Sequence, residues 1–145
     1  MVLIRKISIL ILLCFFSFPA IGKNKIDLQK VSLIDLHVYP EKYHEKTIHV
    51  VGYLSDIPLA LYQSKEYSKL SIGGDSLMVL DDTRNGDLVA SNCSENYVSL
   101  VGVIKLSEET KSNKKYYYIA DVKSVKINDN NKLTYCYKKR SNQAK

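Results

Sequence analysis

Two stretches of the chain alternate apolar and polar side chains with a period of two residues. They are IHVVGYLS, residues 48–55, and VSLVGVIK, residues 98–105. This alternation predicts β-strands with one buried and one outward face. The inward positions are Ile48, Val50, Gly52 and Leu54 in the first strand, and Val98, Leu100, Gly102 and Ile104 in the second. A glycine at the same inward position of both strands indicates a sharp bend or a close backbone approach, as at the corners of a small closed barrel.

Shorter elements surround these two strands. Residues 31–39 carry apolar side chains at helical spacing, with Ser32 as a cap and Pro40 as the end, which predicts one short helix. Short strands are predicted after Pro58 and in the segment SLMVLDD, and a longer strand is predicted at residues 114–128. The pattern therefore predicts a mainly β fold, a small five-stranded barrel with a short N-terminal helix.

The beginning of the chain has the composition of a secretory signal. Residues 1–22 carry Arg5 and Lys6, then an apolar run at residues 7–18, then small residues at Ala20 and Gly22. The run is shorter than the roughly 20 apolar residues that span a bilayer. We therefore expect a cleaved signal peptide and a periplasmic or secreted protein that is not stably inserted in a membrane.

Positive charge is concentrated at the other end of the chain. The formal net charge is +6, but residues 23–131 are close to neutral and residues 132–145 hold five basic and no acidic side chains. We expect one folded domain at residues 31–137, a flexible, solvated basic tail at residues 138–145, and loosely held residues 23–30. A nucleic-acid partner is not expected from a charge that lies in a tail.

Two cysteines, Cys93 and Cys136, remain after signal cleavage. An even pair in an oxidising compartment is more often a bridge than two free thiols, so we expect a disulfide between them. There is no C-x-x-C motif and no histidine at ligand spacing near either cysteine, which disfavours a metal site.

Other candidate chemistry in the sequence is weak. His37, His44 and His49 fall on a predicted helix, turn and strand, and form no ligand set. The segment DDTRNGD, residues 81–87, matches the first half of a calcium loop, but Asn92 stands where the bidentate glutamate is required, so an ordinary turn is favoured. No nucleophile and base stand at a catalytic spacing. We expect neither an enzyme nor a cofactor.

Several short motifs follow one another in a recognisable order. They are Pro40-Glu41-Lys42-Tyr43, Lys46, the strand with Gly52, the segment ALYQSKEYSK and the second valine-glycine strand. Over residues 31–127 this order resembles a family of exported bacterial OB-fold proteins of uncharacterised role, with the patterns P-x-x-Y-x-G-K and V-x-V-x-G-Y-L. Glu45 departs from the family, which has glycine there. The resemblance implies that the two glycine strands are the long first and fourth strands of one barrel.

The tyrosine-rich segment that begins at residue 116 suggests where a ligand could bind. On OB barrels, connections between strands often border the ligand surface, and tyrosines beside lysines can stack on bases or sugar rings. The candidate binding surface consists of Tyr62, Lys114, Lys115 and Tyr116. The alternative is that these tyrosines pack within the sheet.

These features point to two classes of function. The first is a non-enzymatic binding module of the bacterial envelope that contacts a protein or glycan. The alternative is an immunity-type protein that neutralises another protein in the periplasm. The sequence does not identify the partner.

The signal sequence generates the first testable prediction. Mature protein recovered from the soluble envelope fraction should begin near Lys23, because the small residues Ala20 and Gly22 precede it. N-terminal sequencing checks this expectation, and an intact Met1 on envelope-fraction protein would contradict it.

Overall fold

The computed structural model describes residues 27–70, 76–81, 86–88, 91–109, 114–129 and 132–139. The predicted signal peptide and residues 140–145 of the predicted tail lie outside these ranges. Within them, no helix is both long and apolar enough to cross a membrane.

Strands dominate the described chain. In sequence order the elements are β1 (Gln29–Lys30), α2 (Leu33–Val38), the 3-10 helix η2 (Pro40–Tyr43), β2 (Thr47–Asp56), β3 (Leu59–Tyr62), α3 (Lys65–Leu70), β4 (Ser76–Val79), β5 (Asn96–Glu109), β6 (Lys114–Asp129) and β7 (Lys132–Lys138). The predicted short helix is α2, and the side chain of Ser32 caps it by accepting a hydrogen bond from the Asp35 amide.

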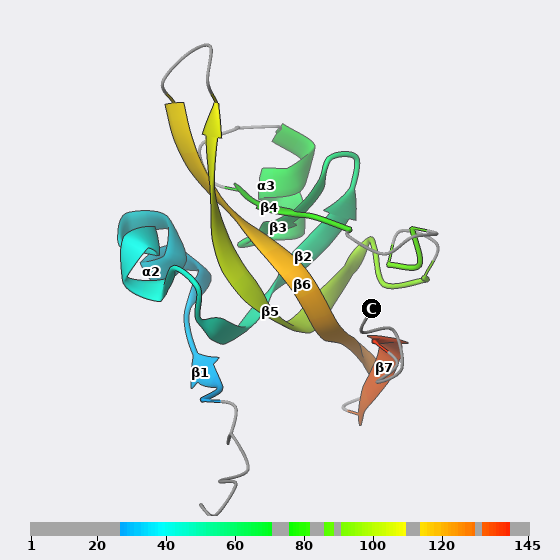
Figure 1. The fold of residues 1–145 in the computed structure, drawn as a ribbon. Helices are drawn as coiled ribbons and strands as arrows, with labels where there is room; N and C mark the ends of the chain where they lie inside the picture. The colour runs from blue at the N-terminus through cyan, green and yellow to red at the C-terminus, as the bar shows by residue number, and fades with distance from the viewer. Residues whose placement is uncertain are drawn as a thin grey trace, which may run out of the picture.

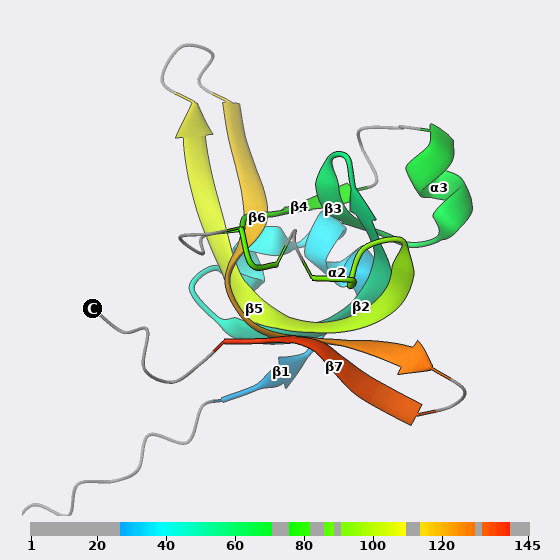
Figure 2. The same cartoon turned by 90° about the vertical axis from the view of Figure 1, so that its right-hand side faces the viewer.

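Five of the strands close into a barrel (Figures 1 and 2). Their order is β2, β3, β4, β6 and β5, and β5 pairs back onto β2. β4 and β6 run parallel, while the other neighbours in the ring are antiparallel. The fold is thus the predicted small OB-like barrel, and the two glycine strands are direct partners from Thr47↔Val103 to Leu54↔Asn96.

The core of the barrel consists of the inward faces that the alternation predicts. Ile48, Val50 and Leu54 on β2 are fully buried, as are Leu100 and Ile104 on β5. The helix α2 covers one end of this core, because Leu33 and Leu36 on its inner side join the same cluster. The apolar residues on the opposite faces of these strands lie on the outer surface of the sheet.

The two inward glycines sit where the backbone has no room for a side chain. A Cβ atom on Gly52 would lie 2.9 Å from the carbonyl oxygen of Tyr62. A Cβ atom on Gly102 would lie 2.5 Å from Ile119 Cγ2 and 3.1 Å from the carbonyl oxygen of Ala120. Gly102 also lies at a bulge, because the pairing of β5 with β6 shifts register on either side of it. Both glycines are close-approach positions of a tightly curved sheet.

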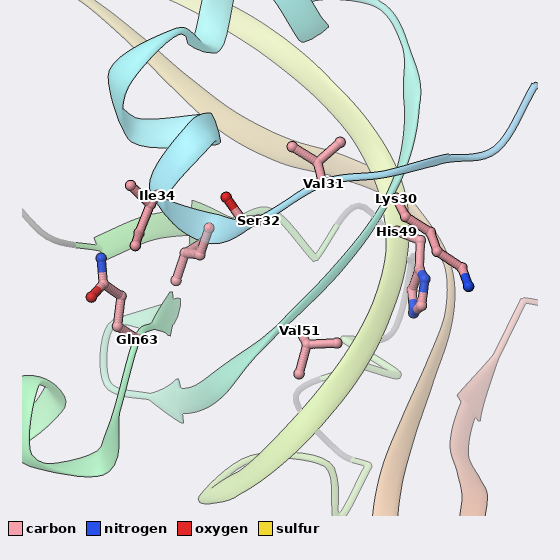
Figure 3. A pocket seen from close by; sticks show the side chains of 8 residues that line it. Lys30, Val31, Ser32, Ile34, His49, Val51 and Gln63 are labelled. Carbon is pink, nitrogen blue, oxygen red and sulfur yellow. The ribbon is translucent and has the colours of Figure 1, made fainter.

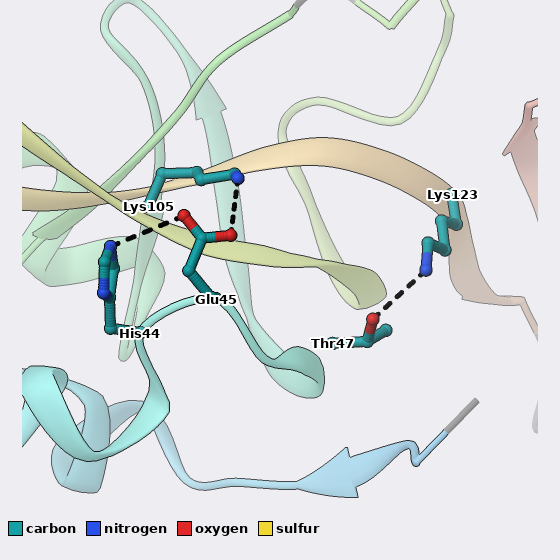
Figure 4. A network of polar contacts seen from close by, with 5 residues as sticks. All are labelled: His44, Glu45, Thr47, Lys105 and Lys123. Atoms are coloured by element: carbon teal, nitrogen blue, oxygen red, sulfur yellow. Dashed lines mark hydrogen bonds and ion pairs between the residues drawn. The ribbon is translucent and has the colours of Figure 1, made fainter. Parts of the chain in front are cut away.

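The turn before β2 has a backbone conformation that is unusual for a residue with a side chain. Glu45 has φ = 61°, a left-handed conformation that favours glycine. Its amide donates to the carbonyl of Ile104 at 2.8 Å, and its carboxylate pairs with Lys105 Nζ at 2.7 Å (Figure 4). The turn therefore has a glycine-type backbone, and an exposed ion pair stabilises the non-glycine residue only slightly.

Two additional strands extend the sheet past both ends of the predicted domain. β1 pairs in parallel with β2, and β7 pairs antiparallel with β6. The predicted loose segment 23–30 thus includes a short strand. At the other end, β7 reaches Lys138, and Lys139 Nζ contacts the carboxylate of Asp121 at 2.6 Å, so these first two residues of the predicted tail are held against β6.

The predicted disulfide is present. Cys93 and Cys136 are bonded, with their Cα atoms 5.5 Å apart. Cys93 is fully buried in the main core, so the bridge fastens β7 to the segment that leads into β5.

The glycine positions generate a prediction on stability. Gly52→Ala and Gly102→Ala should each lower the free energy of unfolding by about 1–3 kcal/mol, because the added methyl group overpacks the sheet. Urea unfolding measures the change. Val51→Thr is the matched control, since Val51 is next to Gly52 in the sequence but points outward and is 60% exposed. This variant should change the free energy of unfolding by less than about 0.5 kcal/mol. Wild-type stability in both alanine variants would show that neither glycine is a barrel corner.

The bridge generates a second stability prediction. Replacing both Cys93 and Cys136 with alanine should lower the free energy of unfolding by about 4 kcal/mol on the chain-entropy model, because the bond spans 43 residues. Chemical denaturation of the oxidised protein, the reduced protein and the double variant measures this loss. Reduced wild type and the variant should both be strongly destabilised, whereas a loss below about 1 kcal/mol in both would show that the bridge does not constrain the unfolded chain.

Candidate functional site

The residues of the predicted binding surface do not share one exposed face. Tyr62 on β3 is only 3% exposed and packs in a small cluster with Tyr53 and Ala60, in the part of the sheet that α3 contacts. Its inclusion in the binding surface was therefore wrong, because neighbouring side chains cover the ring. Tyr116 is half exposed and pairs with Ser107 on the β5–β6 hairpin, which projects beyond the barrel in Figures 1 and 2. Lys115 is also exposed there, and Lys114 is the first residue of β6, so a binding role for this hairpin stays a prediction.

A groove with a different set of residues crosses the outer face of the sheet. We call it the outer groove, and it has a volume of about 520 Å³. Side chains of β2, β5 and β6 line its floor. β1, together with the residue before it, and β7 flank this floor. Its lining residues are Leu28, Lys30, Thr47, His49, Ser99, Val101, Lys123, Ser124, Lys126, Leu133 and Tyr135. β1 and β7 both lie below the barrel in Figure 2, and they lie on opposite sides of its lower end in Figure 1.

Strand register brings these side chains together. Cross-strand partners share a face of a sheet, so one row runs through Lys30, His49, Val101 and Ser124. The next row runs through Val51, Ser99, Lys126 and Tyr135. The alternation that buries Val50 and Leu100 therefore turns His49, Ser99 and Val101 outward into the groove.

The outer groove is electropositive. Lys30, Lys123 and Lys126 line it, and none of its described lining residues is acidic. Lys123 Nζ donates to Thr47 Oγ1 at 3.1 Å, across the groove floor (Figure 4). Lys126 Nζ lies 4.4 Å from the centroid of the Tyr135 ring, and Lys138 Nζ lies 5.3 Å from it. Lysines held by such contacts are partly pre-organised to meet an anion.

His49 and Ser99 form the central polar contact of the groove. His49 Nε2 and Ser99 Oγ are 2.6 Å apart and share a hydrogen bond, although 50 positions separate them in the sequence. Burial lowers the pKa of His49, and the positive charges of Lys30 and Lys126 lower it further. The imidazole is therefore neutral at pH 7, and the pair offers both hydrogen-bond donors and acceptors to a ligand.

A histidine beside a serine also raises the question of catalysis. The sequence did not suggest this pair, because 50 positions separate the two residues. A serine nucleophile needs a base that becomes imidazolium in the reaction, and the neighbouring lysines oppose that charge. The amides of Ser99 and Val101 lie within paired strands, where β-ladder hydrogen bonds occupy backbone N–H groups that could otherwise stabilise an oxyanion. The arrangement is suited to hydrogen bonding with a ligand rather than to acyl transfer.

A second hollow adjoins the outer groove along β2. It has a volume of about 550 Å³ and shares Lys30 and His49 with the groove. Figure 3 shows Lys30 and His49 at one side of this hollow, Ile34 and Gln63 at the other, and Val51 between them. The two depressions thus meet at Lys30 and His49, so a ligand longer than the groove could continue beside α2.

The remaining sequence candidates lie apart from the groove. His37 Nδ1 contacts the carbonyl of Leu33 at 2.8 Å within α2, and His44 lies beside Glu45 in the turn before β2. Across the part of the chain that the structure describes, no three metal-binding side chains cluster. Most of the calcium-loop segment, including Thr83 and Asn85, lies outside that part.

Comparisons of the chain with protein-family models, with curated proteins and with solved structures return no significant match. The functional argument therefore depends on the geometry of the outer groove.

Proposed function

We propose that this protein is a non-enzymatic binding module, exported to the bacterial envelope, that holds an anionic ligand in the outer groove. The observation that carries the proposal is the composition of the groove, which is lined by three lysines and a neutral histidine while no described lining residue is acidic. An apolar depression with a few convergent polar groups is the usual form of a ligand site.

The scaffold supports binding in a second way. The groove floor is formed by three paired strands of a closed barrel, so its side chains are fixed relative to one another before a ligand arrives. Pre-organisation of this kind raises affinity because less conformational entropy is lost on binding.

Export is supported by the predicted signal peptide and by the resemblance to exported OB-fold proteins. A disulfide that ties β7 to the core is compatible with an oxidising compartment. In such a compartment the oxidised form of the groove, flanked by β7, is the form that meets the ligand.

Charge reversal in the groove tests the proposal. Amide chemical shifts are recorded while the mature protein is titrated with poly-L-glutamate, polygalacturonate and poly-dT. At least one polyanion should shift the amides of His49, Ser99 and Lys126. The variant Lys30→Glu/Lys126→Glu should weaken that binding by about tenfold or more, because a hydrogen bond to a charged group contributes on the order of 1.5 kcal/mol.

The matched control is Lys65→Glu/Lys69→Glu, which changes net charge by the same amount on exposed positions of α3. The control should bind as wild type does, and both variants should keep a wild-type melting temperature within a few degrees. Equal loss of binding in the two variants would show attraction by net charge alone. Absence of groove shifts with every polyanion would overturn the proposed site.

A further inference from the structure

We infer that the ligand of the outer groove is an extended polypeptide segment that presents both acidic and aliphatic side chains to the groove; this inference rests on the proposed function of the groove. Three features of the groove distinguish such a segment from other anions: its exposed apolar flanks, the half-exposed Tyr135 ring that two ammonium groups already contact, and the polar side chains at its centre.

The apolar flanks lie on both sides of the lysines. Leu28 precedes β1 and is 47% exposed, and Leu133 on β7 is 57% exposed. Both line the same groove as Lys30 and Lys126. A purely hydrophilic polyanion would leave these side chains in water, whereas a ligand with aliphatic groups between its carboxylates would bury them.

The ring of Tyr135 is already engaged. The ammonium groups of Lys126 and Lys138 lie over it, at 4.4 and 5.3 Å from its centroid. Stacking a sugar ring or a nucleobase would have to displace an ammonium group from the aromatic face. Tyr135 is also the only phenol ring among the described lining residues, so the groove lacks the series of stacking aromatic rings that single-stranded nucleic acids use.

The polar centre of the groove separates a polypeptide from an acyl chain. His49, Ser99 and Ser124 lie on the central strands, between the two apolar flanks. A lipid tail across this centre would remove these groups from water without offering hydrogen bonds in return. A polypeptide has main-chain N–H and C=O groups along its length, and it can satisfy the centre while its side chains reach the lysines and leucines.

Matched synthetic probes test the inference. Affinities for the mature, oxidised protein are measured by calorimetry with two blocked octapeptides. The first consists of two Glu-Glu-Leu-Leu repeats, so that each face of the extended chain carries both glutamate and leucine, and the second consists of two Glu-Glu-Ser-Ser repeats. Octagalacturonate and anionic phospholipid vesicles serve as the glycan and lipid probes. The glutamate–leucine peptide should bind at least tenfold more tightly than the glutamate–serine peptide and than octagalacturonate, and vesicles should not bind.

A variant of the apolar flanks identifies the contact. Leu28→Ser/Leu133→Ser should reduce the advantage of the glutamate–leucine peptide to less than threefold, while affinity for the glutamate–serine peptide stays unchanged. The control Ile57→Ser/Leu70→Ser alters two apolar residues that are more exposed than Leu28 and Leu133 and do not line the groove, and it should preserve the advantage.

The outcomes separate this inference from the proposed function. Octagalacturonate or vesicles could instead bind more tightly than the glutamate–leucine peptide and lose this binding in Lys30→Glu/Lys126→Glu. The groove would then remain an anion site, but the inference of a polypeptide ligand would be overturned. Equal affinity for the two peptides would overturn the role of the flanks and with it the inference. If Lys30→Glu/Lys126→Glu weakens the binding of no probe, or if no probe binds, then both the anion site in the groove and its polypeptide ligand are overturned.

Discussion

The pairing of β2 with β5 is the constraint on which the rest of this structure depends. Eight residue pairs join the two strands, from Thr47↔Val103 to Leu54↔Asn96, and this ladder converts an open sheet into a closed barrel. Closure leaves the five ring strands without free edges and buries their inward faces in one core. The ladder must curve tightly to close, which is why Gly52 and Gly102 occupy positions where a Cβ would meet the neighbouring chain.

Closure also creates the outer groove. β2 pairs with β1, β3 and β5, and β6 pairs with β4, β5 and β7. Both strands have three partners because each is long enough to pair with different neighbours along its length. The strands β1 and β7 therefore flank the outer face of β2, β5 and β6. Without them that face would be an open convex surface; with them it becomes a depression with three lysines from β1 and β6.

The disulfide connects this outer layer to the core. Cys136 belongs to β7, which is exposed over most of its length, while Cys93 is fully buried. A strand with so little buried area would gain little from packing alone, so the covalent link and the ladder to β6 hold it. The position of Leu133 and Tyr135 at the groove thus depends on oxidation as well as on pairing.

The sequence alone determined the faces of the strands, the glycine corners and the cap of α2, because each is a local property, and it indicated the cysteine pair by number rather than by position. Alternation states which residues point inward, a glycine at an inward position indicates a close approach, and the two cysteines that follow the predicted signal peptide have only each other. The departure at Glu45 was visible in the sequence too, although its left-handed backbone was not.

Only the tertiary structure decided which side chains meet. β1 has two residues, too few to show a period, and the basic charge at the end of the chain led us to begin the flexible tail at Lys138, which is the last residue of β7. Tyr62 was predicted at a surface because alternation does not reveal what covers an outward face. His49 and Ser99 are 50 positions apart, and their contact follows from register and barrel closure. Period-two patterning encodes the direction of a side chain, whereas its neighbours depend on pairing between distant segments.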